Sequence, residues 1–210
     1  MKNRIHPSAW DIPYKVRGNC YVFALGPKGE SGGYYRRMYK ARPGDKCSDS
    51  KCCYRDKPIN FSSCSDLVSR IVCDNEKYVV PLRKNASTVT ILPDGYHMMC
   101  AMLSPDDHKD FHFARRFKLT DLSRSDFKRL VNSTPEPAKA QLLNVKPDEF
   151  IWLHQRGWMK GGPICYDASN QLIRNVKTCN MNYGGLNYKK TCSFFKVKTR
   201  HATVTNEHEF

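Results

Sequence analysis

The sequence predicts an α+β fold, in which two helices are followed by a run of antiparallel strands. Residues 20–25 and 62–73 place apolar side chains at helical spacing, whereas residues 94–117 show the period-two alternation of two strands around a turn. A chain of 210 residues suits one domain, and its 40% hydrophobic content is enough to build a core.

The first expected helix begins at Cys20 and ends before Gly26, because glycine followed by proline does not continue a helix. Residues 1–18 contain prolines at two positions and are expected to form an extended N-terminal arm. The second helix is expected to be capped by Ser62 or Ser63, since a hydroxyl oxygen can accept a hydrogen bond from the first turn.

Several segments have the alternation or the β-branched composition of strands. They are residues 78–82, 87–93, 94–103, 111–117, 149–162 with a following hairpin at 163–173, and a closing strand at 187–198. Residues 118–150 interrupt the pattern with helical spacing and predict a helical insertion on the surface of the sheet, with a linker at 134–141. The main domain is therefore expected over residues 18–198, followed by a tail at 199–210.

The formal net charge is +15, from 35 Lys and Arg against 20 Asp and Glu. Such an excess favours polyanionic partners, either an acidic protein or peptide substrate or nucleic acid bound through a basic surface. Lys and Arg scattered over a solvated surface would give the same total. No apolar run has the length of a membrane span, so no membrane partner is expected.

Ten cysteines are many for a chain of this length. The N-terminus has no apolar signal segment, so classical secretion is not expected and a cytosolic chain would keep its thiols reduced. The alternatives are zinc binding or late oxidation in an assembled particle. The spacing of Cys47, Cys52 and Cys53 is poor for zinc, and neither a metal nor a cofactor is expected.

Cys20 and His112 are the candidate chemical pair. A thiol at a helix start meets unpaired N–H groups and a partial positive charge, both of which favour a thiolate and predict a lowered pKa for Cys20. A histidine on a strand in the second half of the chain can take the thiol proton, and a third polar group can fix its tautomer. The alternative is that both residues are ordinary buried side chains.

A series of motifs resembles a papain-like cysteine hydrolase domain found in large DNA viruses, phages and some bacteria, distantly related to bacterial cell-wall endopeptidases. The motifs are GNCYVFALG, RPGD, CSDLVSRIVCDN, DGYHMMCAML, DFHFARRF, RGWMKGG and NYKKTCSFFKV. They cover about residues 18–198 apart from the insertion. The resemblance implies a papain-like fold, with the cysteine-bearing helix packed on the sheet, and a thiol peptidase or isopeptidase activity.

The resemblance also implies roles for individual residues. Cys20 matches the nucleophile and His112 the base, and Asp167, after the tryptophan strand, is the candidate for orienting the imidazole. His154 is the alternative third member. The oxyanion hole is assigned to Cys20, through its backbone N–H, and to Asn19, which precedes the nucleophile as in the pattern.

Two positions depart from the pattern. Ala114 replaces an aromatic residue, and Met159 replaces a histidine. The absence of a histidine at position 159 favours a second function. In this alternative the protein is a structural, minor capsid protein of a large virus particle, which keeps the papain-like scaffold without turnover. Its partners would be neighbouring virion proteins, and either function places the protein in a virion or in the host cytoplasm.

Overall fold

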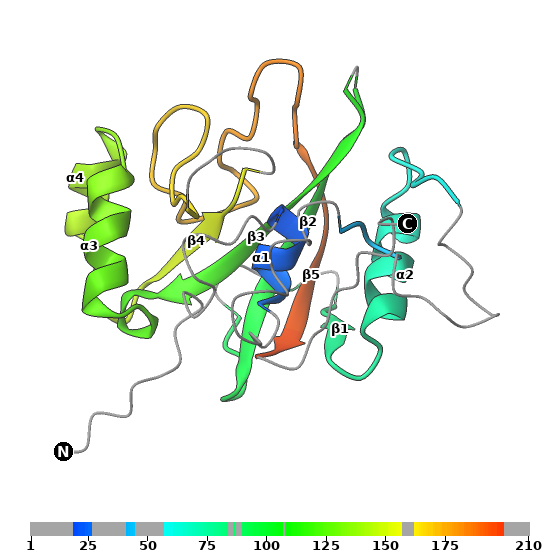
Figure 1. The fold of residues 1–210 in the computed structure, drawn as a ribbon, viewed down its shortest axis with the longest axis horizontal. Helices are drawn as coiled ribbons and strands as arrows, with labels where there is room; N and C mark the ends of the chain where they lie inside the picture. Colours follow the sequence, from blue (N-terminus) through cyan, green and yellow to red (C-terminus); the bar gives the residue numbers. More distant parts are fainter. Residues whose placement is uncertain are drawn as a thin grey trace.

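The structure, a computed structural model, is a mixed α+β fold. It describes residues 19–26, 41–44, 57–83, 86, 90–106, 108–156 and 162–199. Figure 1 shows an antiparallel sheet with one short helix lying over its centre and further helices beside both of its edges. The predicted α+β class is therefore confirmed.

The strands are β1 (Val79–Pro81), β2 (Tyr96–Ser104), β3 (Asp110–Lys118), β4 (Phe150–His154) and β5 (Lys190–Lys198). Their order across the sheet is β1-β5-β2-β3-β4, and every neighbouring pair is antiparallel. β2 and β3 form the predicted hairpin. β5, far along the chain, lies between β1 and β2, so it joins the N-terminal part of the sheet to the rest.

The helices are α1 (Cys20–Leu25), α2 (Cys64–Asp74), the short 3-10 helix η3 (Leu119–Asp121), α3 (Arg124–Ser133) and α4 (Ala138–Leu143). In Figure 1, α1 lies across β3, α2 lies beside β1 and β5, and α3 and α4 lie beyond the β4 edge. α3 and α4 follow β3 after the short η3 and form the helical insertion that the sequence predicts.

α1 is short, and two local features fix its ends. The Asn19 side chain accepts hydrogen bonds from the backbone N–H groups of Tyr21 and Val22, each at 3.1 Å. Gly26 ends the helix in the left-handed conformation, with a φ of 56°. A Cβ at Gly26 would also collide with the Arg115 guanidinium of β3, so a larger residue would force that side chain to move.

The two faces of the sheet carry separate parts of the core. One cluster unites α1 and α2 with the side chains of β2, β3 and β5 that point toward these helices, among them Met99, Phe113 and Phe195. The opposite face packs against the 173–188 segment, and this cluster includes Met102, Trp152 and Tyr188. The successive residues of β3 therefore divide between two different environments.

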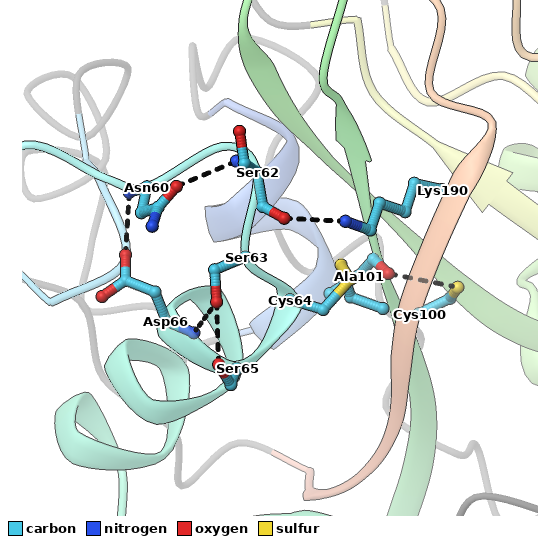
Figure 2. The surroundings of a disulfide bond; sticks show 10 residues. Asn60, Ser62, Ser63, Cys64, Ser65, Asp66, Cys100, Ala101 and Lys190 are labelled. Carbon is cyan, nitrogen blue, oxygen red and sulfur yellow. Dashed lines mark hydrogen bonds between the residues drawn. A yellow bond between two sulfur atoms is a disulfide. The ribbon is translucent and has the colours of Figure 1, made fainter.

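A disulfide joins α2 to β5. Cys64, the first residue of α2, is bonded to Cys192, with a Cα–Cα distance of 5.0 Å and a sequence separation of 128. Figure 2 shows that the same junction is held by Lys190, whose ammonium group donates to the Ser62 carbonyl at 2.8 Å. Cys73 is also disulfide-bonded, so the expectation of reduced thiols is wrong for these cysteines.

Most predicted elements are confirmed, with small shifts at their ends. The strand expected over 149–162 is confirmed only for Phe150–His154, and residues 157–161 lie outside the described residues. Three further elements differ. Residues 90–93 are not a strand, the expected hairpin at 163–173 contains only isolated bridges, and α4 begins inside the predicted linker. The N-terminal arm at 1–18, residues 87–89 and residues 200–210 of the tail lie outside the described residues.

Candidate functional site

Cys20 occupies the first position of α1, as predicted. Its thiol donates to the backbone carbonyl of Phe111 over an Sγ–O distance of 3.9 Å, and the backbone N–H of Phe113 interacts with the same sulfur. His112 lies between these two residues in the chain. β4 pairs with β3 only from Ala114 onward, so the thiol lies beside the part of β3 that β4 leaves unpaired.

The Cys20 thiol is protonated in this environment. Its side chain is 5% exposed, and burial raises the pKa of Cys20 well above its ordinary value, with the Asp110 carboxylate adding to the increase. The expectation that the helix start would lower this pKa is therefore wrong. Desolvation of a thiolate outweighs the partial charge of so short a helix.

His112 points toward the face of β3 opposite α1. Its neighbours Phe111 and Phe113 pack with α1, and successive side chains of a strand point to opposite faces. The imidazole stacks on the ring of Tyr188, with centroids 4.7 Å apart and planes 29° apart. The Tyr188 hydroxyl donates to the Asp110 carboxylate at 2.7 Å, which fixes the ring against which His112 packs.

His112 and His154 form a hydrogen-bonded pair, from Nε2 of the first to Nδ1 of the second at 2.8 Å. His154 Nε2 lies 3.1 Å from the Tyr166 carbonyl oxygen, which can only accept. His154 Nε2 must therefore carry a proton, its Nδ1 accepts, and His112 Nε2 donates. This network leaves His112 Nδ1 with a free lone pair, so His112 is a candidate base.

Both imidazoles are neutral. Burial lowers the pKa of His112 well below its ordinary value, and the neighbouring His154 and Arg156 act in the same direction. Burial also lowers the pKa of His154 to about 4, although the Tyr166 carbonyl opposes the change. Neutral rings are what the tautomer assignment requires, because a doubly protonated ring has no acceptor nitrogen.

Asp167 does not orient His112. Its carboxylate accepts backbone N–H groups from Ser169 and Gln171 at 2.9 and 3.0 Å, and from Asn180 at 2.8 Å. No hydrogen bond joins it to either imidazole among the described residues. Asp167 is a turn residue that holds two loops together, and the orienting position predicted for it is occupied by His154, the alternative third member.

The Asn19 side chain is held by the fold at both of its polar atoms. Its oxygen caps α1, and its Nδ2 donates to the Ala41 carbonyl at 2.5 Å. An amide nitrogen carries two N–H groups, so one N–H of Asn19 is left over, and its part in the oxyanion hole stays a prediction. The cap bonds the N–H groups of Tyr21 and Val22 and leaves the Cys20 N–H, which is the other donor of the predicted oxyanion hole.

The thiol and the imidazole are neighbours along β3 but are not in contact. Among the described residues, no hydrogen bond joins Cys20 to His112 or His154, and the thiol bonds the Phe111 carbonyl instead. Met159, where the resemblance expects a histidine, lies outside the described residues. The structure therefore places both candidate groups at one end of β3, with the thiol turned toward the backbone.

Sequence reasoning missed three residues around the histidine pair. They are Asp110 and Tyr188, which support the His112 ring, and Arg156, which lies close enough to lower the pKa of both histidines. All three belong to motifs of the resemblance: Asp110 begins DFHFARRF, Arg156 begins RGWMKGG, and Tyr188 lies in NYKKTCSFFKV. The motifs therefore contained a signal for these residues, but the sequence did not show which side chains they contact.

Within the described parts of the chain, no cluster of three or more His, Cys, Asp or Glu side chains is arranged to hold a metal ion. No described helix is long and apolar enough to cross a membrane. Comparison with protein-family models, curated proteins and solved structures finds no match to this chain. A function for this site is therefore argued from its geometry.

Proposed function

We propose that the protein is a papain-like thiol hydrolase that cleaves a peptide or isopeptide bond, with Cys20 as nucleophile, His112 as base and His154 orienting the base. One observation carries the proposal. The Cys20 thiol contacts the Phe111 carbonyl and the Phe113 N–H, which lie on either side of His112 in β3. The His112 imidazole is held by His154 and keeps a free lone pair on its own Nδ1. Buried, perturbed titratable groups gathered in this way are typical of functional sites.

The reaction would follow from these positions. The Cys20 thiol transfers its proton to His112 Nδ1, and the sulfur attacks the scissile carbonyl carbon. The oxyanion of the tetrahedral intermediate is stabilised by the Cys20 N–H at the helix start. The imidazolium returns its proton to the leaving amine, which gives a thioester, and water then releases the acid and regenerates the thiol.

The reaction also requires a change at the sulfur. The thiol must leave the Phe111 carbonyl, which now accepts its proton. Because the His112 imidazole points to the face of β3 opposite α1, the imidazole must also move before its Nδ1 comes within reach of the sulfur at the start of the strand. In the resting state this proton transfer is unfavourable, because burial raises the pKa of the thiol and lowers the pKa of the imidazole, so the reaction requires substrate binding to change the surroundings of both groups. Resting Cys20 is therefore expected to react slowly with alkylating reagents until a substrate is bound.

A fluorescence-quenched peptide library, together with isopeptide-linked peptides, tests the activity. Cys20→Ala and His112→Gln should abolish cleavage while far-UV circular dichroism stays unchanged. Cys100→Ala is the matched control, since Cys100 is also a buried free cysteine but lies on β2. Cleavage that survives Cys20→Ala, or that is lost equally in Cys100→Ala, would overturn the assignment of Cys20.

A second candidate function is a structural protein of a virus particle that keeps this scaffold without turnover. It is favoured by the burial of Cys20, whose raised pKa makes an inert thiol, and by the Cys64–Cys192 disulfide, which suits late oxidation in a particle. Complete absence of cleavage by the wild-type chain, with the protein found in purified particles, would favour this function over the hydrolase.

A further inference from the structure

Arg156 lies at the rim of the histidine pair, two residues after the end of β4. Its guanidinium carbon is 4.4 Å from the centroid of the Tyr183 ring and 5.8 Å from that of Tyr166. The Tyr183 hydroxyl in turn lies 3.4 Å from His154 Nε2. A single aromatic side chain therefore separates Arg156 from the hydrogen-bonded imidazoles.

The guanidinium is held in place but is not neutralised. No acidic side chain in the described residues forms an ion pair with Arg156, and its Nε–H is buried without a hydrogen-bond partner. Asp167 is the carboxylate whose charge reaches His154 and Tyr183, but its oxygens already accept three backbone N–H groups. A buried donor without a partner is unfavourable, so within the described residues the fold retains at this point a cation with an unpaired N–H and no carboxylate partner.

The surroundings of Arg156 favour one class of ligand. The neighbouring imidazoles are neutral, so the guanidinium provides a single positive charge. The two tyrosine rings contact it through cation–π interactions, and the Tyr183 hydroxyl also accepts one of its N–H groups. Among the described residues the remaining N–H groups of the guanidinium have no acceptor and are available to a ligand. A planar, singly charged carboxylate matches this edge in shape and charge, because it can accept two parallel N–H bonds.

We propose that Arg156, which is partly exposed, is a substrate-binding residue that receives a carboxylate of the peptide or protein substrate next to the histidine pair. This inference rests on the proposed hydrolase function and defines its substrate class as acidic. The carboxylate belongs either to an Asp or Glu side chain or to a free C-terminus.

Binding can be measured without turnover in the Cys20→Ala background by ¹⁵N-¹H correlation spectra. The Arg156 Nε–H resonance is followed where Arg156 is present, and the backbone N–H resonance of Tyr183, whose ring contacts the guanidinium, is followed in every variant. Two isomeric probes distinguish the sources of the carboxylate. N-acetylglutamic acid α-amide carries only a side-chain carboxylate, and N-acetylglutamine carries only an α-carboxylate. N-acetylglutamine amide is the neutral control, and inorganic phosphate tests for a phosphate site.

One of the two carboxylates should shift the Arg156 resonance at millimolar concentration, and the neutral amide should not. Arg156→Gln should weaken that binding about 10- to 100-fold, and Arg156→Lys should restore only part of it, because lysine keeps the charge without the planar fork. Arg174→Gln is the control, since Arg174 is an exposed arginine paired with Glu149, and it should leave the affinity unchanged.

Binding of phosphate but of neither carboxylate would overturn the proposal, as would carboxylate binding that survives Arg156→Gln. Absence of any shift up to about 50 mM of either carboxylate would overturn it too, since a charge-assisted pair should be detectable there. These outcomes are independent of cleavage. If the hydrolase assignment fails in the library assay, the binding result still decides whether Arg156 is a carboxylate site.

Discussion

His112 Nε2 lies 2.8 Å from His154 Nδ1, and this contact determines which nitrogen of each imidazole carries a proton. The Tyr166 carbonyl at the far end of the pair is an obligate acceptor, so the proton positions follow from one backbone group. The free lone pair is left on His112, the member of the pair that lies on the strand contacted by Cys20. His154, itself oriented by a backbone carbonyl, thus occupies the position where an acidic side chain was predicted.

Replacing His154 tests this arrangement. His154→Gln retains a carbonyl oxygen that can accept from His112 Nε2, whereas His154→Leu leaves that buried N–H without a partner. We expect the leucine variant to lower kcat at least 10-fold and the glutamine variant to keep most of it. The ¹⁵N shifts of His112 provide a readout apart from turnover, and a leucine variant with unchanged His112 shifts would contradict the assigned tautomer.

The buried histidines should make stability depend on pH. His154 has an ordinary pKa of 6.5 and a folded pKa of about 4, so between these values the unfolded chain binds more protons than the folded chain. Its contribution is fully present above about pH 6.5 and is lost as the pH falls toward 4. We expect the free energy of unfolding to fall by about 3 kcal/mol across this window on account of His154.

Urea denaturation at several pH values checks this dependence. His154→Gln removes the titrating group, so its stability should fall less steeply between pH 6.5 and 4 than that of the wild type. The carboxylates contribute equally to both proteins and cancel in the comparison. Parallel curves for the two proteins would show that His154 is not neutral and buried as described.

Asp167 should be important for stability and not for chemistry. In Asp167→Asn one carbonyl oxygen is kept, and an NH₂ group takes the place of the oxygen that accepts the Asn180 N–H. Two donors then face each other, so this substitution should lower the free energy of unfolding by about 2–3 kcal/mol. Asp106→Asn is the matched control, because its ion pair with Lys189 is exposed and should contribute at most about 1 kcal/mol.

The two roles of Asp167 are separated by measuring stability and turnover on the same variant. At a temperature where it is fully folded, Asp167→Asn should retain wild-type kcat and an unchanged pH profile. A fall in kcat with unchanged stability would return Asp167 to the orienting role predicted from the sequence.

The Cys64–Cys192 disulfide should contribute strongly to stability, since it closes a long segment of the chain. The chain-entropy model gives about 3–5 kcal/mol for a loop of this length. We expect the Cys64→Ser, Cys192→Ser double variant to unfold at a correspondingly lower urea concentration, and reductant to destabilise the wild type more than the variant. Equal stabilities without reductant would mean that the bond does not form in solution.

Elements with local signals could be predicted from the sequence. The bounds of α1 follow from Asn19 and Gly26, and the β2–β3 hairpin follows from alternation around a turn. The start of α4 was missed because the prolines at 135 and 137 suggest a linker, although proline is compatible with the first turn of a helix. Residues 163–173 were predicted as a hairpin but form only isolated bridges. Whether bridges extend into strands depends on contacts with distant residues, which the local sequence does not show.

The site was only partly predictable, because it too depends on contacts between residues that are distant in the sequence. Cys20 and His112 are marked by motifs, but the partner of His112 depends on strand register. His154 pairs with Ala114, which places it diagonally beside His112 on the same face of the sheet. A shift of one residue would have turned His154 to the other face. Asp167 was favoured by its place in the chain, while its actual contacts are those of a turn residue.

The position of β5 has a consequence for how the protein is made. β1 and β2 are adjacent along the chain, yet each pairs with β5 and not with the other. On the ribosome, β1 therefore has no partner strand until Lys190–Lys198 has emerged from the exit tunnel, long after the β2–β3 hairpin is available. Cys64 is therefore made long before its partner, and only the arrival of Cys192 completes both the sheet and the covalent link between α2 and β5.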